Sequence, residues 1–205
     1  MVRIYCTGRG ENTGSAAVYA LLDYAFRNSC SGDMPSIKKT PRGKPYFPER
    51  PDIHFSLSHG HTHVLCALSG SPVGADIESP RVIGGKALKF FCSRRELAMF
   101  DPLDLWVLKE SYIKLFGLTL AEIRDLRFTR EAGGRLLCSI YPAAEKSKLL
   151  NDEAQELSPR FTPVYSQLYR VDGCRAAVCA VDPQLPDSIE LISSSADILK
   201  YPLNN

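Results

Sequence analysis

Hydrophobic residues recur with two different periods in the first part of the chain. From Ser15 to Arg27 they recur every three to four positions, the spacing that lines one face of an α-helix. Short segments at residues 2–6, 54–58 and 63–68 instead carry the alternating or continuous apolar pattern that is typical of β-strands. Residues 29–52 contain five prolines and therefore predict a loop that crosses the surface.

The middle of the chain changes from strand to helix. Residues 73–78 predict a further strand, and two helical segments follow at residues 85–100 and 103–116. Asp101-Pro102 separates the two helices, because proline is tolerated in a first helical turn and disrupts a helix interior. The remainder is expected to be mainly strand, with a polar loop near residues 145–159.

These elements predict an α+β fold with a strand-and-helix set on each side of about residue 70. We therefore divide the chain into an N-terminal half, residues 1–70, and a C-terminal half, residues 71–205, within one compact unit. A chain of 205 residues with 44% hydrophobic content can bury a core of this size.

Composition narrows the class of protein. The formal net charge of +2 is too small to indicate nucleic acid binding, and no run approaches the roughly 18 apolar residues needed to span a bilayer. The seven cysteines lack a C-x-x-C pair and the N-terminus lacks an apolar signal segment. We expect a cytoplasmic protein that binds neither nucleic acid nor membrane.

Acidic residues on the third strand suggest a metal site. Asp76 and Glu78 are two positions apart, so they point to the same face while Ile77 enters the core. On the second helix, Glu110 and Lys114 are neighbours at i and i+4. Carboxylate oxygens suit Mg2+, and Mn2+ accepts similar ligands. The alternative is a solvated strand edge and an ordinary surface ion pair.

A third segment favours the metal site. Phe55-Ser56-Leu57-Ser58-His59-Gly60 alternates apolar and polar residues and ends in serine, histidine and glycine. Hydroxyl, imidazole and backbone N–H groups at such a turn are good donors to an anion. The three segments together suggest a cation and positive side chains arranged around a phosphate.

In order and spacing, these segments resemble the 4'-phosphopantetheinyl transferases of the surfactin-synthetase-activator type. The hallmarks of that family are an F-x-x-S-H-S-like loop, a G-x-D-x-E strand and a W-x-x-K-E-S-x-x-K helix. The resemblance extends from about Ile37 to about Leu199 and also includes Gly43-Lys44-Pro45, Phe91–Glu96 and Ala176–Ala180.

The resemblance implies a fold and a reaction. Members of the family are pseudo-two-fold pairs of similar α+β halves that bind coenzyme A in the cleft between them. They move the 4'-phosphopantetheine arm of coenzyme A to a serine of an acyl or peptidyl carrier protein and release adenosine 3',5'-bisphosphate. We accordingly expect a Mg2+-dependent monomeric enzyme whose partners are coenzyme A and an apo carrier protein.

The resemblance also implies roles for single residues. Asp76, Glu78 and Glu110 are the expected metal ligands, and Lys114 is expected against a phosphate oxygen. The base that removes the proton of the carrier serine is left open between Glu110, Glu96 and a metal-bound water.

Coenzyme A contacts follow from two further segments. Gly43, Lys44 and Pro45 are expected along the adenine, and Ser58 with His59 is expected at the phosphates, including the 3'-phosphate. Where larger relatives carry basic residues before and at the start of the first helix, this chain is expected to have a shortened N-terminus and Gly14-Ser15-Ala16-Ala17. The candidates to replace those basic residues are Lys38, Lys39 and Arg42.

Two other functions stay open at this point. One is a relative that binds coenzyme A without turnover, although such a protein has little need for a full set of acidic ligands. The other is a different Mg2+-dependent nucleotide hydrolase, such as a phosphatase, which would need no carrier protein. The sequence does not identify the carrier protein or its pathway, nor whether acyl-coenzyme A is accepted.

Overall fold

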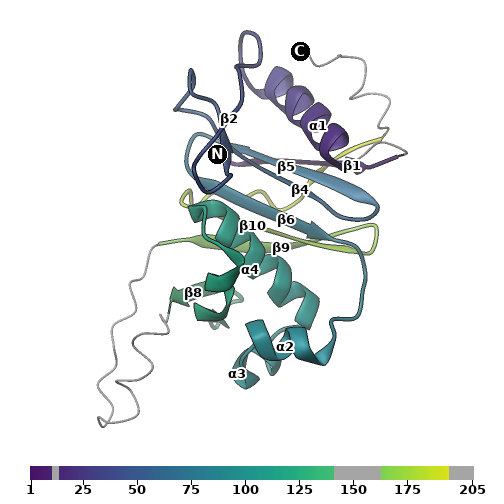
Figure 1. Ribbon diagram of the computed structural model, residues 1–205, viewed down its shortest axis with the longest axis vertical. Coiled ribbons are helices and arrows are strands. Elements are labelled where there is room, and N and C mark those ends of the chain that lie inside the picture. Colours follow the sequence, from purple (N-terminus) through teal and green to yellow (C-terminus); the bar gives the residue numbers. More distant parts are fainter. Residues whose placement is uncertain (11–13, 141–162, 194–205) are drawn as a thin grey trace.

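The computed structural model describes residues 1–10, 14–140 and 163–193, and it confirms a mixed α+β fold. Four layers follow one another down the long axis of the molecule: a helix, a four-stranded sheet, a three-stranded sheet, and a second helical layer (Figure 1). Three hydrophobic clusters fill the three spaces between these layers. The predicted polar loop at residues 145–159 lies outside the described residues.

The first two layers come mainly from the N-terminal part of the chain. Helix α1 covers one face of the four-stranded sheet (Figure 1), which explains the apolar period of three to four in its sequence. The sheet has the order β11-β1-β5-β4, with β11 parallel to β1 and the other pairs antiparallel. The bounds are α1 Gly14–Ser29, β1 Arg3–Gly8, β4 His54–His59, β5 His63–Ser69 and β11 Glu190–Ile192.

The third layer is a separate antiparallel sheet of order β6-β10-β9. Its inner face packs on the first sheet through small and branched side chains of β1, β5, β6 and β10. Its outer face carries helix α4, which crosses it (Figure 1). The bounds are β6 Val73–Glu78, β9 Tyr165–Val171, β10 Cys174–Ala180 and α4 Pro102–Phe116.

The fourth layer contains α4 together with short elements. These are α2 Gly85–Phe91, α3 Arg94–Leu97, the 3-10 helix η1 Leu120–Asp125, and the hairpin β7 Leu126–Arg130 with β8 Leu136–Ile140. A further two-residue pair, β2 Lys38–Lys39 and β3 Pro45–Tyr46, lies in the proline-rich connection after α1. Within the described residues, none of the helices is both long and apolar enough to cross a membrane.

The single helix predicted at residues 85–100 is wrong, because the chain leaves the helical conformation at Cys92 and Ser93. Both residues have extended backbone angles, and Ser93 then starts α3. The Ser93 hydroxyl accepts from the Glu96 amide at 3.2 Å, and the Glu96 carboxylate accepts from the Ser93 amide at 2.8 Å. This reciprocal capping box stops one helix and begins another, and its S-x-x-E pattern is visible in the sequence.

Helix α4 has well-defined ends, as the sequence predicts. Asp101 accepts from the Leu103 amide at 2.9 Å, and Pro102 occupies the first helical turn. Gly117 ends the helix in the left-handed conformation with φ of 63°, which costs glycine little. These caps place the start of α4 at Pro102 and its end at Phe116.

A buried ion pair ties the middle of α4 to α3 and β7. The Lys109 ammonium is fully buried, lies 2.9 Å from Glu96 Oε1, and also donates to the carbonyls of Phe91 and Leu126. Burial lowers the pKa of Lys109. Burial alone would raise the pKa of Glu96, but Lys109 and backbone donors outweigh it and hold that pKa below its usual value.

Candidate active site

Gly74 sets the distance between α4 and β6. A Cβ atom at this position would clash with the Ser111 carbonyl oxygen and with the Leu115 backbone, both on α4. Only a residue without a side chain allows the helix to lie directly on the strand. This contact explains the glycine of the G-x-D-x-E pattern and brings Glu110 and Lys114 over the face of β6 that carries Asp76.

Substituting Gly74 by alanine is therefore expected to lift α4 off β6. Because the obstacle is backbone on both sides, we expect a loss of about 1–3 kcal/mol in the free energy of unfolding. Denaturant melts would measure this loss. Gly84→Ala is a matched control, since nothing lies within 4 Å of a Cβ added there. Equal stability of the two variants would contradict the close approach of α4 to β6.

Asp76 lies at the centre of a hydrogen-bonded cluster. Its Oδ1 accepts from the Lys114 ammonium at 2.7 Å and from the Ser58 hydroxyl at 2.7 Å. Lys114 also donates to Ser58 Oγ at 2.9 Å. The structure thus brings together one side chain each from β4, β6 and α4, which are far apart in the sequence.

Ser58 also joins the two sheets. Its hydroxyl oxygen accepts from the Ile77 amide at 3.3 Å, and the neighbouring inward serine, Ser56, accepts from the Ala75 amide at 2.9 Å. These bonds satisfy backbone amides of β6 that have no strand partner on the β4 side. Ser58 is buried, so its position on β4 fixes the position of Asp76.

Glu110 is half-buried one turn before Lys114. Burial and the nearby Asp76 carboxylate, with a smaller contribution from Glu78, raise the pKa of Glu110 to about 7, although Lys114 acts in the opposite direction. The shift shows that the three expected metal ligands are close enough for their charges to interact.

Glu78 has a different set of partners. Trp106 Nε1 donates to its Oε1 at 3.0 Å, and Arg81 donates to both carboxylate oxygens at 3.1 and 3.3 Å. The Trp106 ring also packs edge-on against Phe91. The bond from Trp106 to Glu78 was not among the contacts predicted from the sequence. The signal was its spacing, since Trp106 is four residues before Glu110 on the same helix.

The residues present suit a hard divalent cation. Asp76 Oδ2 is buried and has no hydrogen-bond partner among the described residues, as expected for an oxygen that is available to coordinate a cation. The donor set is entirely carboxylate oxygen, which matches Mg2+ or Mn2+. Within the described residues, no three acidic, histidine or cysteine side chains already surround one point. Arg81 and Lys114 instead hold Glu78 and Asp76.

A pocket of about 230 Å³ opens beside Lys114. It is lined by the predicted adenine loop, Gly43, Lys44 and Pro45, and by the end of α4 with Gly117. Lys44 donates to the carbonyls of Leu115 and Val73 at 2.7 and 3.2 Å, and its burial lowers its pKa to about 8. Lys44 therefore ties the loop to β6 and to the end of α4.

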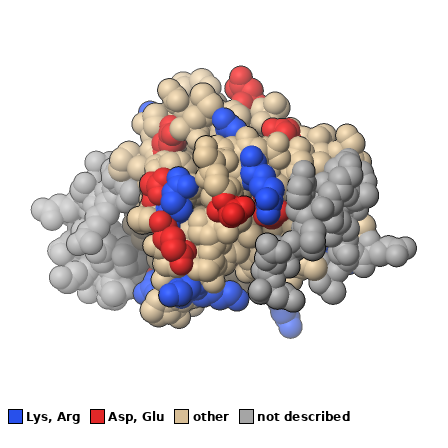
Figure 2. Space-filling view, turned by 90° about the horizontal axis from the view of Figure 1, so that it is seen from above, with Lys and Arg blue, Asp and Glu red and all other residues tan. Residues whose placement is uncertain are grey.

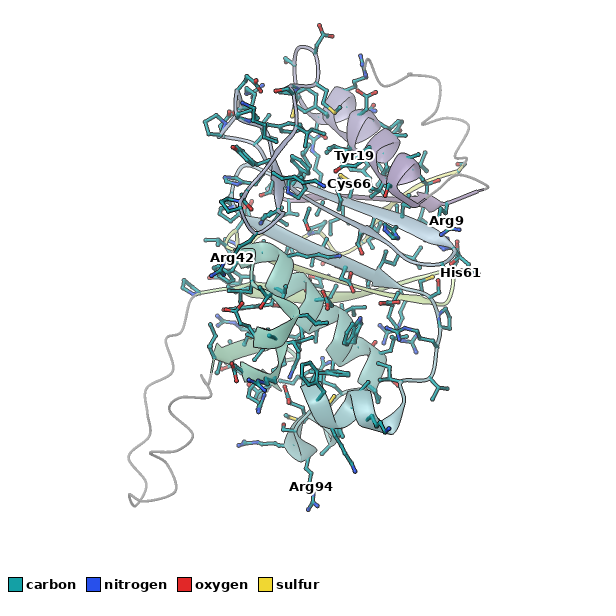
Figure 3. All side chains as sticks on the ribbon, viewed as in Figure 1. Arg9, Tyr19, Arg42, His61, Cys66 and Arg94 are labelled. Atoms are coloured by element: carbon teal, nitrogen blue, oxygen red, sulfur yellow. The ribbon has the colours of Figure 1, made fainter. Side chains whose placement is uncertain are left out.

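His59 stands at the other end of β4. Its exposed imidazole lies against Gly14 at the start of α1, where an added Cβ would come 2.9 Å from ring atoms. Arg42 lines the pocket, whereas His61 of the same turn as His59 lies on the opposite side of the molecule (Figure 3). Lys38 and Lys39 are exposed on β2. Arg42 is thus not beside His59.

Arg9 is a residue near this turn that the sequence analysis missed. Its amide donates to the Thr62 carbonyl at 2.8 Å, and Figure 3 shows it on the same side of the molecule as His61. The Arg9 Nε atom is buried and has no hydrogen-bond partner in the described part of the chain. No sequence pattern marks Arg9, because its proximity to the turn arises from the pairing of β1 with β5.

Glu96 lies away from the acidic cluster. Its two carboxylate oxygens accept from the Phe128 and Ser93 amides and face Lys109, and the residue is 1% exposed. These contacts give Glu96 a structural part in holding α3, β7 and α4 together. The pairing of Lys109 with Glu96 was not predicted from the sequence.

Comparisons with known proteins point to one family. Residues 72–164 match the family described as the 4'-phosphopantetheinyl transferase superfamily. The chain is 32% identical over 165 residues to the 4'-phosphopantetheinyl transferase Sfp of Bacillus subtilis (strain 168). The matched region covers 74% of this chain and 65% of that protein. A second Bacillus subtilis protein, the 4'-phosphopantetheinyl transferase ffp, is 30% identical over 75% of this chain and 66% of its own length.

A third relative matches a shorter region. The 4'-phosphopantetheinyl transferase gsp of Aneurinibacillus migulanus is 37% identical over 91 residues, which is 40% of this chain and 38% of that protein. The chain spans just under two thirds of the length of the two Bacillus subtilis relatives. Residues 72–164 thus match the 4'-phosphopantetheinyl transferase superfamily, and about three quarters of the chain is similar to Sfp and its relatives.

Proposed function

We propose that this protein transfers the 4'-phosphopantetheine arm of coenzyme A to a serine of an acyl or peptidyl carrier protein, with release of adenosine 3',5'-bisphosphate. The observation that carries the proposal is the cluster of Ser58, Asp76 and Lys114 beside Glu110, at the edge of a pocket large enough for part of a nucleotide. The cluster combines acids for a cation with a positioned ammonium, as phosphoryl-group transfer requires.

In this proposal Asp76, Glu78 and Glu110 would hold Mg2+, whose charge would offset that of the pyrophosphate of coenzyme A. Lys114 turns part of its hydrogen bonding from Asp76 to a phosphate oxygen. Glu110 takes the proton of the carrier serine, directly or through a water. Glu96 is the weaker candidate, because both its oxygens are engaged and it is almost fully buried.

The proposed binding sites for the parts of coenzyme A are the pocket and the turn that contains His59. The adenine would lie in the pocket along Gly43, Lys44 and Pro45, and the 3'-phosphate would lie near His59 at the start of α1. The proposed cleft lies between two similar halves related by a pseudo-two-fold axis, with the division near residue 70. Arg9 is our candidate for the basic residue that assists His59, ahead of Lys38, Lys39 and Arg42.

Other properties complete the proposal. We propose a monomer that acts in the cytoplasm, where all seven cysteines would remain unpaired as they are in the structure. We further propose that it acts without nucleic acid. Acidic and basic side chains are interspersed on the face shown in Figure 2, which is unlike the broad basic surface of nucleic-acid-binding proteins.

Intact-mass measurement of the carrier tests the transfer. The protein, Mg2+ and coenzyme A are mixed with a panel of apo carrier proteins, and at least one carrier is expected to gain one phosphopantetheine. The gain should vanish with a chelator and return with added Mg2+. Binding of coenzyme A with no mass gain on any carrier would support the non-catalytic alternative. Breakdown of coenzyme A without a carrier would support a hydrolase.

His59→Ala is expected to raise the Michaelis constant for coenzyme A by tens of fold. The reason is loss of a charge-assisted hydrogen bond to phosphate, which typically costs about 1.5–3 kcal/mol. Steady-state kinetics with coenzyme A and 3'-dephospho-coenzyme A measure the effect, and the second substrate should show a much smaller change.

His61→Ala is the matched control, because His61 is an exposed histidine of the same turn. It should leave both Michaelis constants nearly unchanged. Equal penalties for the two substrates in His59→Ala would show that His59 does not contact the 3'-phosphate. Arg9→Gln would then be the next variant to compare on the same pair of substrates.

A further inference from the structure

Glu78 is held by two neighbours of opposite character. Arg81 forms a two-point contact, with Nη2 3.1 Å from Oε1 and Nε 3.3 Å from Oε2. Trp106 donates its neutral indole N–H to Oε1 at 3.0 Å. A carboxylate has about four acceptor directions, so these three donors leave little room for another ligand. A cation that binds Glu78 must therefore compete with one of them.

Arg81 is the neighbour that can leave. Its side chain is 47% exposed, and an ion pair exposed to solvent contributes only about 0–1 kcal/mol to stability. Its guanidinium also lies 5.6 Å from the centre of the Trp106 ring, and a cation–π interaction at such an exposed site is modest as well. Trp106 cannot leave in the same way, because its ring packs edge-on against buried Phe91 at 5.1 Å and against the cluster around α4.

We propose that Arg81 occupies Glu78 in place of the divalent cation and departs when the cation binds, while Trp106 holds the carboxylate in its binding orientation. This inference rests on the proposed Mg2+-dependent function. Arg81 carries a full charge of the same sign as the cation and takes both oxygens, so it should weaken metal binding. The indole N–H carries no net charge and fixes one oxygen, so it should strengthen metal binding.

The same arrangement recurs on the neighbouring ligand. Lys114 contacts Asp76 Oδ1 while Asp76 Oδ2 has no partner among the described residues. Each acidic residue of β6 thus carries one cationic side chain before metal enters. The two cations differ in reach, because Lys114 is on α4 beside the pocket, whereas Arg81 follows β6 in an exposed segment. Arg81 is therefore the one whose removal tests competition without altering the proposed phosphate contact.

The experiment is a calorimetric titration of the intact protein with Mn2+, without coenzyme A or carrier. Arg81→Gln is expected to bind Mn2+ about three to ten times more tightly than the unsubstituted protein. Trp106→Phe keeps an aromatic ring against Phe91 and is expected to bind about tenfold more weakly. Arg81→Lys keeps the charge and should fall between Arg81→Gln and the unsubstituted protein. Thermal melts check that each variant is folded.

Trp106 also supplies an optical signal, because it is the single tryptophan of the chain. Titration with Mg2+ should change its fluorescence in the unsubstituted protein as Arg81 leaves the ring. In Arg81→Gln the change should be much smaller, although calorimetry still detects binding. Arg94→Gln is the matched control, because Arg94 is an exposed arginine that projects from α3 at the far end of the molecule (Figure 3).

The outcomes separate this inference from the proposed function. Unchanged or weaker Mn2+ binding in Arg81→Gln, with normal binding in the unsubstituted protein, would overturn the role of Arg81 and leave the transferase proposal standing. If Trp106→Phe folds and binds Mn2+ as tightly as the unsubstituted protein, Trp106 does not hold Glu78 in its binding orientation. If the unsubstituted protein binds neither Mn2+ nor Mg2+, with or without coenzyme A, both the metal-dependent function and this inference fail.

Discussion

Asp76→Asn is expected to lower the rate of phosphopantetheine transfer by about 10²–10³-fold, the range found when one preorganised electrostatic contact to a reacting group is lost. Asp76 contributes in two ways. In the proposed site it would offer its unpartnered oxygen to the cation, and it holds Lys114 and Ser58 through its other oxygen. Asparagine keeps the shape of the side chain but removes the charge that pairs with Lys114 and that the proposed cation would require.

The fold should survive this substitution. The Asp76–Lys114 pair is only partly buried, and an amide oxygen can still accept from Ser58 and Lys114, so the free energy of unfolding should change by about 1 kcal/mol at most. Carrier mass measured over time gives the rate, and denaturant melts give the stability. Asp52→Asn is the control, because Asp52 is exposed and pairs with Arg50 on the surface. Near-normal transfer by Asp76→Asn at limiting Mg2+ would refute the metal assignment.

Lys109→Met is expected to produce the largest loss of stability. Removing one partner of a buried ion pair leaves the other charge without compensation and typically costs about 3–5 kcal/mol. Here Glu96 would remain buried, and the carbonyls of Phe91 and Leu126 would lose their donor. For a chain of this size, the loss corresponds to a melting temperature lower by roughly 10 °C.

A second variant separates the ion pair from simple packing. Adding Glu96→Gln to Lys109→Met removes the stranded charge, so the double variant should recover part of the lost stability. Lys86→Met, on the exposed face of α2, should change stability by no more than about 0.5 kcal/mol. Equal losses in the single and double variants would show that the charge of Glu96 is not what destabilises the protein.

The same pair gives stability a defined dependence on pH. The pKa of Glu96 is lower in the folded protein than its ordinary value of 4.5. Its contribution is therefore fully present above about pH 4.5 and is lost as the pH falls through the lower pKa of the folded state. The pH dependence of transfer by the folded protein should not reflect protonation of Glu96, because the oxygens of Glu96 face Lys109 and backbone donors.

The sequence by itself determined most of the local structure. The strands that carry Ser58, Asp76 and Glu78 and the helix that carries Glu110 and Lys114 were predicted correctly, because side-chain period is a property of the local backbone. The same reasoning correctly paired Asp76 with Glu78 and Glu110 with Lys114 as neighbours on one element. It was wrong for residues 85–100, where a capping box outweighed a continuous helical pattern.

Only the tertiary structure decided which elements meet. Periodicity does not show that Ser58 would contact Asp76, that Trp106 would bind Glu78, or that Lys109 would be buried against Glu96. The residues of these three contacts are 18, 28 and 13 positions apart in the sequence, respectively. Such contacts depend on how sheets and helices stack. Gly74 shows the reason most directly, because a missing side chain on one strand sets where α4 lies and so where its charged residues point.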